Sequence, residues 1–460
     1  MSGQRRRRAA AAGRGRTRLT RRGRILMWSA AVTSVVVLGA GGVGAWVYQD
    51  LNGNIKSADV DDKIGGGRPV NLSPGSKNIL IVGSDSRAGA NAGYGKDLTT
   101  MQSDTLMLLH VPANRKWATV VSFPRDSWVD IPACDKGDGS TSAPHSFKIN
   151  QAFAIGGSGG EVSSAAACSI KTVEANTGLR VDNFMSVDFQ GFKGMVDALG
   201  GIEVCPKQAI RSKKARLDLR PGCQTVAGDK ALGYVRVRYG VGDGSDIGRI
   251  GRQQEFMDAL VKKAQDRLTS PNSLYGFLQS ATKSLTTDPK LAGVKPLYGL
   301  ASMLKGIPSD RLTFLTVPNY PREADVATDR ANVVWQYPQA ADLFTALAKD
   351  REVDKKELES SAKQPVYASS VRVRVLNGTG VQGRAAAVAE RLRADGVAVT
   401  GTDNAPELAA TKVTYPAGLE RQAAALAGRL RGVRPAAAQD APPGVITLVV
   451  GKNLALDDIR

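Results

Sequence analysis

The feature that most constrains this chain is an uncharged, apolar stretch near its N-terminus. No Asp, Glu, Lys or Arg occurs from Ile25 to Tyr48. A helix of that length, rising ~1.5 Å per residue, is longer than the ~30 Å hydrocarbon core of a bilayer. We therefore expect a single transmembrane helix over residues 25–48. The alternative is a cleaved signal peptide, because Gly44 and Ala45 are small enough for a cleavage site, but the apolar stretch exceeds the usual signal-peptide core.

Charged residues before this stretch predict its orientation. Residues 1–24 contain ten arginines and no acidic residue, about half of the formal net charge of +19. Such a tail stays in the cytoplasm, so we expect residues from 49 onward to be extracytoplasmic. A basic tail at this position suits anionic lipid headgroups. Because no helix-turn-helix pattern accompanies it, we expect membrane lipid rather than nucleic acid as its partner.

Four cysteines follow the membrane segment: Cys134, Cys168, Cys205 and Cys223. Their number is even and their spacing is not that of a metal site, so two disulfides are expected outside the cytoplasm. Cys205 and Cys223 bracket a basic excursion, and closing a loop of that size is worth ~3 kcal/mol in the chain-entropy model. A bond between Cys134 and Cys168 then follows by elimination.

The rest of the chain is long enough for two folded units. Residues 49–75 are polar and rich in Gly, Asp and Pro, and we expect them to form a stalk. We expect a first α/β domain over residues 76–350, a linker over residues 351–369 and a small second α/β domain over residues 370–453.

Three apolar strands are expected at the start of the first domain, at residues 78–82, 106–111 and 117–123. Each has an acidic residue or an arginine at a boundary, where α/β folds collect site residues. Asp85 follows the first strand and Asp104 precedes the second, so they would face each other if these strands run antiparallel. Two carboxylates near several arginines indicate a Mg²⁺ ion that bridges protein and phosphate. The alternative for each aspartate is a turn or cap residue.

A basic, glycine-rich segment from Tyr234 to Gln254 predicts an anion site. Side chains two apart in a strand point the same way. The alternating sequence that begins at Tyr234 therefore predicts a strand with Arg236 and Arg238 on one face. Two guanidinium groups side by side favour an anion.

A helix is expected to begin near Arg249, directly after this segment. Arg249, Arg252 and Gln253 would lie in its first turns, where free backbone N–H groups also favour negative charge. The arginines of the strand and the helix therefore indicate a phosphorylated ligand. The alternative is that they pair with structural carboxylates or lie on a solvated face.

Residues 187–199 predict a helix with a long apolar face, formed by Phe189, Phe192, Val196 and Leu199. The first interpretation is a face that packs in the core. The alternative is the wall of a slot for a lipid chain.

The second domain begins with a strand at residues 371–376 and continues in β-α-β-β-α-β order. Gly378, Gly380 and Gly383 follow the strand with the spacing of a dinucleotide-binding fingerprint. The domain is too small for two mononucleotide-binding halves, so we interpret these glycines as a tight turn.

The first domain contains seven short motifs in a fixed order. They are N-I-L-I-V-G-S-D-S-R (78–87), S-D-T-L-M-L (103–108), S-F-P-R-D-S-W-V-D-I-P (122–132), K-I-N-Q-A-F (148–153), V-D-F-Q-G-F-K-G-M-V-D-A-L-G-G-I (187–202), A-L-G-Y-V-R-V-R (231–238) and D-I-G-R-I-G-R-Q-Q (246–254). Together they resemble the LytR–CpsA–Psr family of cell-wall ligases. The second domain resembles the LytR C-terminal domain.

The resemblance implies a membrane-anchored, extracytoplasmic phosphotransferase that moves a glycopolymer from a polyprenyl diphosphate carrier onto peptidoglycan. It also implies a mixed sheet flanked by helices, with a hydrophobic lipid slot. By motif, Asp85 and Asp104 would hold Mg²⁺ (or Mn²⁺). The diphosphate would be bound, and the charge that develops on it during transfer stabilised, by Arg125, Arg236, Arg238, Arg249 and Gln253. The same motifs also contain Arg87, Asp246 and Arg252.

Two positions depart from the family pattern. Gln102 stands where the family usually has an arginine before S-D-T, so one phosphate contact is lost or supplied by another side chain. Gln151 stands where many members have His or Ser after K-I-N, so no chemistry is assigned to it.

Few other catalytic chemistries fit the composition. His110 and His145 are the only histidines, and neither H-E-x-x-H nor G-x-x-x-x-G-K-[ST] occurs. Phosphoryl transfer requires positioning and charge neutralisation rather than a histidine nucleophile. Two alternatives to the transferase are a non-catalytic binder of wall polymer or lipid diphosphate, and a membrane-bound transcriptional attenuator.

Overall fold

The computed structural model describes residues 44–84, 101, 103–213, 215–237, 246–267 and 271–459. The expected basic tail (1–24) and most of the expected transmembrane helix (25–48) lie outside the described residues. Residues 44–54 are helical. No helix within the described ranges is long and apolar enough to cross a membrane. The chain divides into two units, residues 1–51 and the compact folded unit of residues 52–460.

A seven-stranded mixed sheet forms the centre of the first domain, in the order β1-β12-β7-β2-β3-β4-β13. Its strands are β1 (Lys56–Ser57), β2 (Lys77–Ser84), β3 (Ser103–Val111), β4 (Ala118–Phe123), β7 (Asn183–Asp188), β12 (Leu285–Thr287) and β13 (Leu312–Thr316). β3 is antiparallel to both β2 and β4, whereas β7 is parallel to β2 and β13 to β4. The three strands expected from apolar runs are present, because runs of Ile, Leu and Val suit a sheet buried on both faces.

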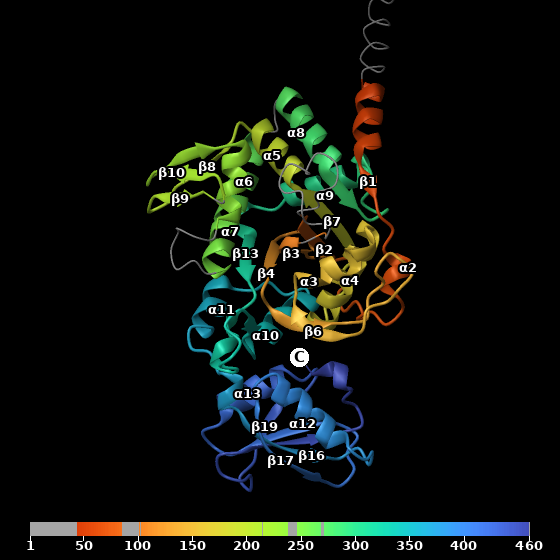
Figure 1. The fold of residues 1–460 in the computed structure, drawn as a ribbon, viewed down its shortest axis with the longest axis vertical. Coiled ribbons are helices and arrows are strands. Elements are labelled where there is room, and N and C mark those ends of the chain that lie inside the picture. The colour runs from red at the N-terminus through yellow and green to blue at the C-terminus, as the bar shows by residue number, and fades with distance from the viewer. Residues whose placement is uncertain are drawn as a thin grey trace, which may run out of the picture. The chain divides into compact units, whose positions relative to one another are not determined.

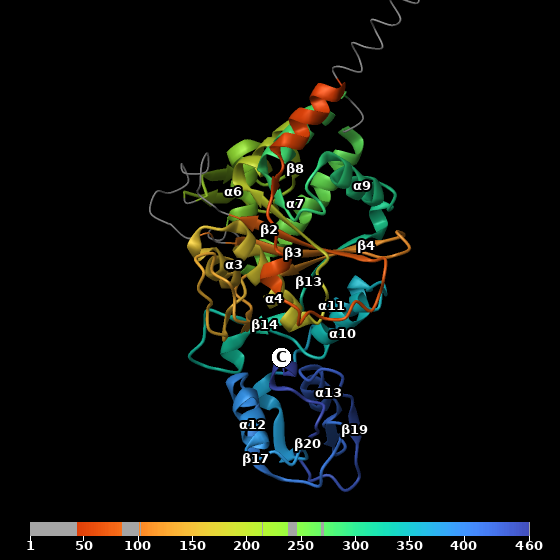
Figure 2. The same cartoon turned by 90° about the vertical axis from the view of Figure 1, so that its right-hand side faces the viewer.

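Helices cover both faces of this sheet, as Figure 1 and Figure 2 show. The core on one face includes residues of α2 (Asp61–Ile64), α3 (Gln151–Gly156), α4 (Val162–Thr177), α10 (Gln339–Ala348) and α11 (Lys355–Ser361). The core on the other face includes residues of α7 (Asp246–Arg267) and α9 (Val294–Lys305). A further apolar cluster joins α7 to α5 (Phe189–Ala198), α6 (Gly228–Arg236) and α8 (Pro271–Ser284). The expected α/β class, with a mixed sheet flanked by helices, is confirmed.

Two disulfide bonds join the four cysteines in the expected pairs. The bond between Cys205 and Cys223, with an S–S distance of 2.05 Å, closes the basic excursion. The excursion contains β9 (Ile210–Ser212) and β10 (Leu217–Leu219), which pair as an antiparallel ladder. It is flanked by β8 (Ile202–Val204) and β11 (Gln224–Val226), which form a second antiparallel ladder. Cys134 and Cys168, 2.07 Å apart at sulfur, join the segment after β5 (Trp128–Ile131) to α4.

Residues 52–75 differ from the expected stalk, because they pack along the first domain. β1 pairs with β12 at the edge of the central sheet. Val60 and Ile64 of the α2 region are buried in the main core. Arg68 forms an ion pair of 2.6 Å with Glu174 of α4, whose side chain is 4% exposed. The polar composition of the segment gives little indication of these few buried contacts, which the expectation of a stalk over residues 49–75 did not include.

The expected linker also contains regular structure. Helix α11 begins after Asp354, whose carboxylate accepts hydrogen bonds from the backbone N–H groups of Lys356 and Glu357. This is the pattern of an N-cap residue. Leu358 of α11 is buried in the main core, so this half of the linker belongs structurally to the first domain.

The second domain is a two-layer α/β unit. Its elements are β16 (Arg372–Asn377), α12 (Arg384–Ala394), β17 (Ala398–Asn404), β18 (Lys412–Tyr415), α13 (Glu420–Gly428), β19 (Pro435–Ala437) and β20 (Ile446–Val450), with the sheet order β17-β16-β20-β18-β19. The order of elements agrees with the expectation except for the added short strand β19. Gly380 and Gly383 have φ values of +75° and +78°, so the glycine motif forms a turn that requires left-handed backbone.

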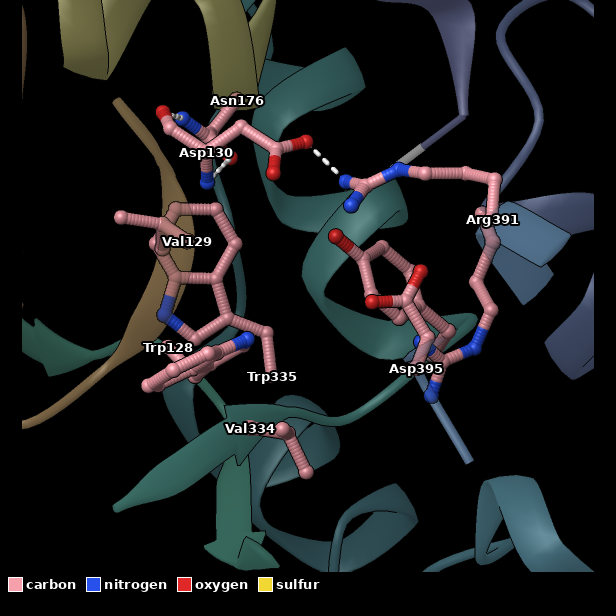
Figure 3. A pocket seen from close by; sticks show the side chains of 10 residues that line it. Trp128, Val129, Asp130, Asn176, Val334, Trp335, Arg391 and Asp395 are labelled. Carbon is pink, nitrogen blue, oxygen red and sulfur yellow. Dashed lines mark hydrogen bonds and ion pairs between the residues drawn. The ribbon is translucent and has the colours of Figure 1, made fainter. Parts of the chain in front are cut away.

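The two domains contact each other between β5 and α12, as Figure 3 shows. Arg391 of α12 forms an ion pair with Asp130 of β5. Arg322 stacks on the Trp128 ring, 4.4 Å from its centroid, and donates a hydrogen bond of 2.9 Å to the carbonyl oxygen of Ala394. A cavity of about 30 Å³ remains between these side chains. A cavity of this size suits water rather than a sugar.

Candidate functional site

The segment from Gly228 to Arg236 forms helix α6, so the expected strand from Tyr234 to Arg238 was wrong. Ala231 and Tyr234, spaced three residues apart, are buried against α5 and α7. This helical packing outweighs the short alternation of valines and arginines, because five residues of alternation are a weak signal. Arg236 lies in the last turn of α6. Arg238 lies outside the described residues.

Asp104 is the centre of the described site. Its Oδ1 accepts a hydrogen bond of 3.0 Å from Nη1 of Arg125, and its Oδ2 lies 3.7 Å from Nη2 of Arg236. The side chains are 23%, 20% and 34% exposed, respectively. A carboxylate held between two partly exposed guanidinium groups keeps both arginines at one place on the surface.

The strand register explains why Asp104 and Arg125 meet. Leu106 of β3 pairs with Phe123 of β4 in the antiparallel ladder. Asp104 lies two residues before Leu106, and Arg125 lies two residues after Phe123, so the antiparallel pairing places both at the same edge of the sheet. Asp104 is therefore inside β3 rather than before it, at the second residue of the strand.

The described part of β2 ends at the same edge. Ser84, the last residue of β2, pairs with Ser103, the first residue of β3. β2 and β3 are antiparallel, as the expected meeting of Asp85 and Asp104 requires. Asp85 is the next residue after Ser84, but it lies outside the described residues, as do Arg87 and Gln102.

Arg236 is also positioned by an aromatic ring. Its guanidinium carbon lies 4.3 Å from the centroid of the Phe189 ring, at the start of α5. A cation held over an aromatic face is stabilised by ~0.5–1 kcal/mol or more as it loses water. The Asp188 side chain caps α5 by accepting a hydrogen bond of 2.8 Å from the backbone N–H of Gly191. The helix start is thus fixed, and with it the ring under Arg236.

Arg125 belongs to a chain of charges that the sequence interpretation did not identify as a site. Nε of Arg125 lies 3.5 Å from Oδ2 of Asp126, and Nζ of Lys148 lies 2.7 Å from Oδ1 of the same carboxylate. Lys148 ends β6 (His145–Lys148), which pairs with β5. Both residues occur in the P-R-D and K-I-N motifs, which were the available signal.

The expected ligand-binding residues of α7 hold the end of α6 in place. Gln253 is 7% exposed and donates hydrogen bonds from Nε2 to the Val235 carbonyl oxygen (2.9 Å) and to Thr105 Oγ1 (3.4 Å). Arg252 donates from Nη2 to the Val237 carbonyl oxygen, at 2.5 Å. Both acceptors belong to the C-terminal turn of α6, whose carbonyls lack partners within the helix. Arg249 lies deeper in α7, at 2% exposure.

Residues 47–349 match the family model described as the LytR-CpsA-Psr family. This range covers well over half of the chain. The chain belongs to the LytR-CpsA-Psr family. A second model, described as "LytR cell envelope-related transcriptional attenuator", matches residues 370–453.

Several curated relatives of this LytR-CpsA-Psr protein have names that refer to the cell wall. "Cell wall biosynthesis protein LcpA" of Corynebacterium glutamicum is 30% identical over 406 residues, which cover 82% of this chain and 76% of LcpA. "Probable cell wall biosynthesis protein LcpB" of the same organism is 39% identical over 204 residues, but the match spans only 43% of LcpB. TagT of Bacillus subtilis, named a polyisoprenyl-teichoic acid–peptidoglycan teichoic acid transferase, is 28% identical over 62% of this chain and 84% of TagT.

Solved structures of similar proteins include a LytR-Csp2A-Psr enzyme from Actinomyces oris. It is 19% identical, with a TM-score of 0.46, and the match covers 64% of this chain and 96% of that chain.

Proposed function

We propose that this protein is a membrane-anchored, extracytoplasmic phosphotransferase. It moves a glycopolymer from a polyprenyl diphosphate carrier onto a sugar hydroxyl of peptidoglycan. The observation that carries the proposal is the meeting of Asp104, Arg125 and Arg236 at one edge of the sheet. The names of the relatives TagT and TagU, which are peptidoglycan teichoic acid transferases, support the same reaction class. The transmembrane helix at residues 25–48 anchors the chain with its arginine-rich tail in the cytoplasm.

In this proposal the diphosphate of the donor binds to Arg125 and Arg236. Planar guanidinium groups match phosphate oxygens well, because they donate paired hydrogen bonds. The Asp104 carboxylate holds both guanidinium groups close together, so the diphosphate site is preorganised before the donor binds. Arg87 and Arg238, which lie outside the described residues, are proposed to add further contacts. Arg249, Arg252 and Gln253 contribute by supporting α6, on which Arg236 lies.

The donor set at this edge fits a Mg²⁺ (or Mn²⁺) ion. Mg²⁺ usually binds one or two carboxylates together with phosphate oxygens, and the partly exposed Asp104 carboxylate is of this type. Asp85 would supply the second carboxylate, next to the paired Ser84 and Ser103. Among the described residues, one cluster of three metal-binding types consists of Glu203, Cys205 and Cys223, but both of its sulfurs form a disulfide. When bound, the ion would neutralise charge on the diphosphate oxygens.

The reaction is a displacement at the sugar-linked phosphorus. The acceptor hydroxyl oxygen forms a new bond to that phosphorus, and its proton passes to water. The bond from the phosphorus to the oxygen of polyprenyl phosphate breaks, and polyprenyl phosphate leaves. Negative charge grows on the phosphoryl oxygens and on the leaving phosphate. Arg125 and Arg236 stabilise this charge, and preorganised donors of this kind often provide the largest part of catalysis.

We propose that the lipid chain lies along the apolar side of the sheet next to α7 and α9. Partly buried Met185, Met257 and Met303 gather there with Ile81, and methionine adapts well to flexible apolar ligands. The apolar face of α5 is a weaker choice. Val196 and Leu199 are buried in a core cluster, as the first interpretation of that face expected.

A transfer assay distinguishes this function from non-catalytic binding. The full chain in detergent is incubated with Mg²⁺, peptidoglycan and a polyprenyl diphosphate donor whose polymer is radiolabelled. We expect label that stays on peptidoglycan after boiling in detergent, together with release of polyprenyl phosphate. Reversible retention of label, without a covalent product, would instead identify a binding protein.

A further inference from the structure

One face of the C-terminal sheet is covered by helices and the other is open. Val373 and Val375 of β16 and Leu448 of β20 are buried against α12 and α13. Figure 1 shows both helices on one side of the strands. Within the described residues, no helix or strand covers the opposite face. Three of the four strand pairings are parallel, and parallel sheets are usually covered on both faces.

The strand register shows which residues form the open face. Arg374 of β16 pairs with Thr447 of β20, which pairs with Thr414 of β18. In the neighbouring row, Leu376 pairs with Val449, and Val449 pairs with Lys412. Directly paired residues have side chains on the same face of a sheet. One row of this face therefore contains an arginine and two threonines, and the next row contains two half-buried apolar residues and a lysine. We call this face the open sheet face.

The open sheet face is positively charged. Arg372, Arg374 and Lys412 are exposed on it, whereas Asp403 is its acidic residue and forms an ion pair of 2.8 Å with Arg374. In the part of the chain that the structure describes, Arg372 and Lys412 form no ion pair. The second domain as a whole has eleven Lys and Arg residues against six Asp and Glu residues over residues 370–453. This balance favours an anionic partner.

We propose that the open sheet face binds an anionic polysaccharide or polyol-phosphate chain of the cell wall. Arg372, Arg374 and Lys412 would contact its phosphate or carboxylate groups, and Thr414 and Thr447 would donate hydrogen bonds to its hydroxyl or ether oxygens. A flat row of contacts across three strands suits an extended chain better than a small molecule. The assignment to the wall rests on the proposed function, whereas the preference for a polyanion rests on the face itself.

The domain contacts leave this face available. Arg391 of α12 pairs with Asp130 of the first domain, and Ala394 at the end of the same helix accepts a hydrogen bond from Arg322. Among the residues that the structure describes, the first domain therefore contacts the helix layer rather than the open sheet face. A chain bound at the open sheet face would raise the local concentration of polymer near the transferase domain.

Binding can be measured without any transfer. The full chain in detergent is titrated with fluorescent poly(glycerol phosphate), polygalacturonate or neutral dextran, and fluorescence anisotropy is recorded. We expect both polyanions to bind, dextran not to bind, and affinity to fall as salt rises. The triple variant Arg372→Gln, Arg374→Gln, Lys412→Gln should bind roughly tenfold more weakly, the loss expected for three exposed charge contacts.

The matched control removes three positive charges elsewhere. Lys290, Lys355 and Arg393 are exposed and lie off the open sheet face, so Lys290→Gln, Lys355→Gln, Arg393→Gln should bind as the wild type does. Equal weakening in both triple variants would show a general charge effect and overturn the proposal. Binding of dextran as tight as that of the polyanions would overturn it as well. The binding assay contains no polyprenyl diphosphate donor, so its result does not depend on whether the protein catalyses transfer. Failure of the binding proposal can therefore be distinguished from failure of the proposed transferase function.

Discussion

Arg125 donates a hydrogen bond of 3.0 Å to Asp104, and this contact joins the end of β4 to the start of β3. Arg236 approaches the same carboxylate from α6, at 3.7 Å. Three separate elements of the chain therefore meet at one acid. If Asp104, Arg125 and Arg236 together bind a diphosphate, each of them is required for transfer. None of them is then required for the domain to fold.

The first prediction concerns Arg236. Arg236→Ala should lower turnover by ~10²–10³, the usual loss when one charge-stabilising donor is removed. Its effect on folding should be small, because the side chain is one-third exposed. Arg211→Ala is the control, since Arg211 is 81% exposed in the disulfide-bonded excursion. Transfer by Arg236→Ala at the rate of Arg211→Ala, measured with a radiolabelled donor, would contradict the assignment.

Strands β2, β3 and β4 were predictable from sequence because they are runs of β-branched and aliphatic residues with polar residues at their ends. Strands β1, β7 and β12 of the same sheet were not expected. The meeting of Asp85 and Asp104 was expected only if the first two strands run antiparallel, and β2 and β3 fulfil this condition. Helix α6 was not predictable in this way. Its Tyr234 is buried by contacts with residues of α5 and α7. The five-residue sequence from which a strand was predicted gives no information about these tertiary contacts.

The charge chain through Asp126 and Lys148 was missed for a different reason. Lys148 is 22 residues from Asp126 and reaches it only because β5 and β6 form a hairpin. Both residues lie in recognised motifs, but neither motif indicates that the two side chains meet. The packing of residues 52–75 was missed similarly, because Val60 and Ile64 are two apolar residues in a polar segment. A tertiary contact that rests on one or two side chains has no periodic signature.

The second prediction separates positioning from direct binding in α7. Gln253→Ala leaves the buried Val235 carbonyl oxygen without its side-chain donor and should cost about 1–3 kcal/mol of unfolding free energy. It should also lower transfer, because the last turn of α6 carries Arg236. Urea unfolding measures the first effect and the transfer assay measures the second.

Gln254→Ala provides the matched control on the same helix. Gln254 donates a hydrogen bond of 2.9 Å to Thr316 Oγ1 in β13, away from α6. This variant should lose some stability but retain transfer. If both glutamine variants lost transfer equally, α7 would act through general stability and the positioning role of Gln253 would be wrong.

The third prediction tests the packing of the segment after the expected membrane helix. Arg68→Met leaves the Glu174 carboxylate buried without its ion pair, and breaking a buried pair costs ~3–5 kcal/mol. The double variant Arg68→Met, Glu174→Gln should recover part of this loss. Lys290→Met, which removes an exposed pair with Asp61, should cost at most ~1 kcal/mol. Equal unfolding free energies for Arg68→Met and Lys290→Met would show that residues 52–75 do not contribute to the folded domain.

The fourth prediction concerns the pH dependence of stability. His110 is buried in β3, with its Nδ1 2.8 Å from Asn78 Oδ1 and its Nε2 3.1 Å from Asp350 Oδ1. Burial lowers the pKa of His110 below its ordinary value of 6.5, although the carboxylates of Asp350 and Asp182 oppose this shift. Below about pH 6.5 the unfolded chain therefore binds a proton that the folded chain resists. Stability should fall as pH drops through 6.5 toward the folded pKa, by at most ~1.4 kcal/mol per pH unit.

Thermal melts at pH 8 and pH 5.5 measure this effect. His110→Gln should lower the melting temperature at both values, since it disturbs a buried contact, but the difference between the two should shrink. His145→Gln is the control because His145 is exposed in β6 and is the chain's second histidine. This variant retains the buried His110 and should therefore retain the pH dependence of the melting temperature that His110 contributes. If His110→Gln showed the same change in melting temperature between pH 8 and pH 5.5 as the wild type, the buried imidazole would contribute nothing to the pH dependence of stability. The titrating group would then lie elsewhere in the protein.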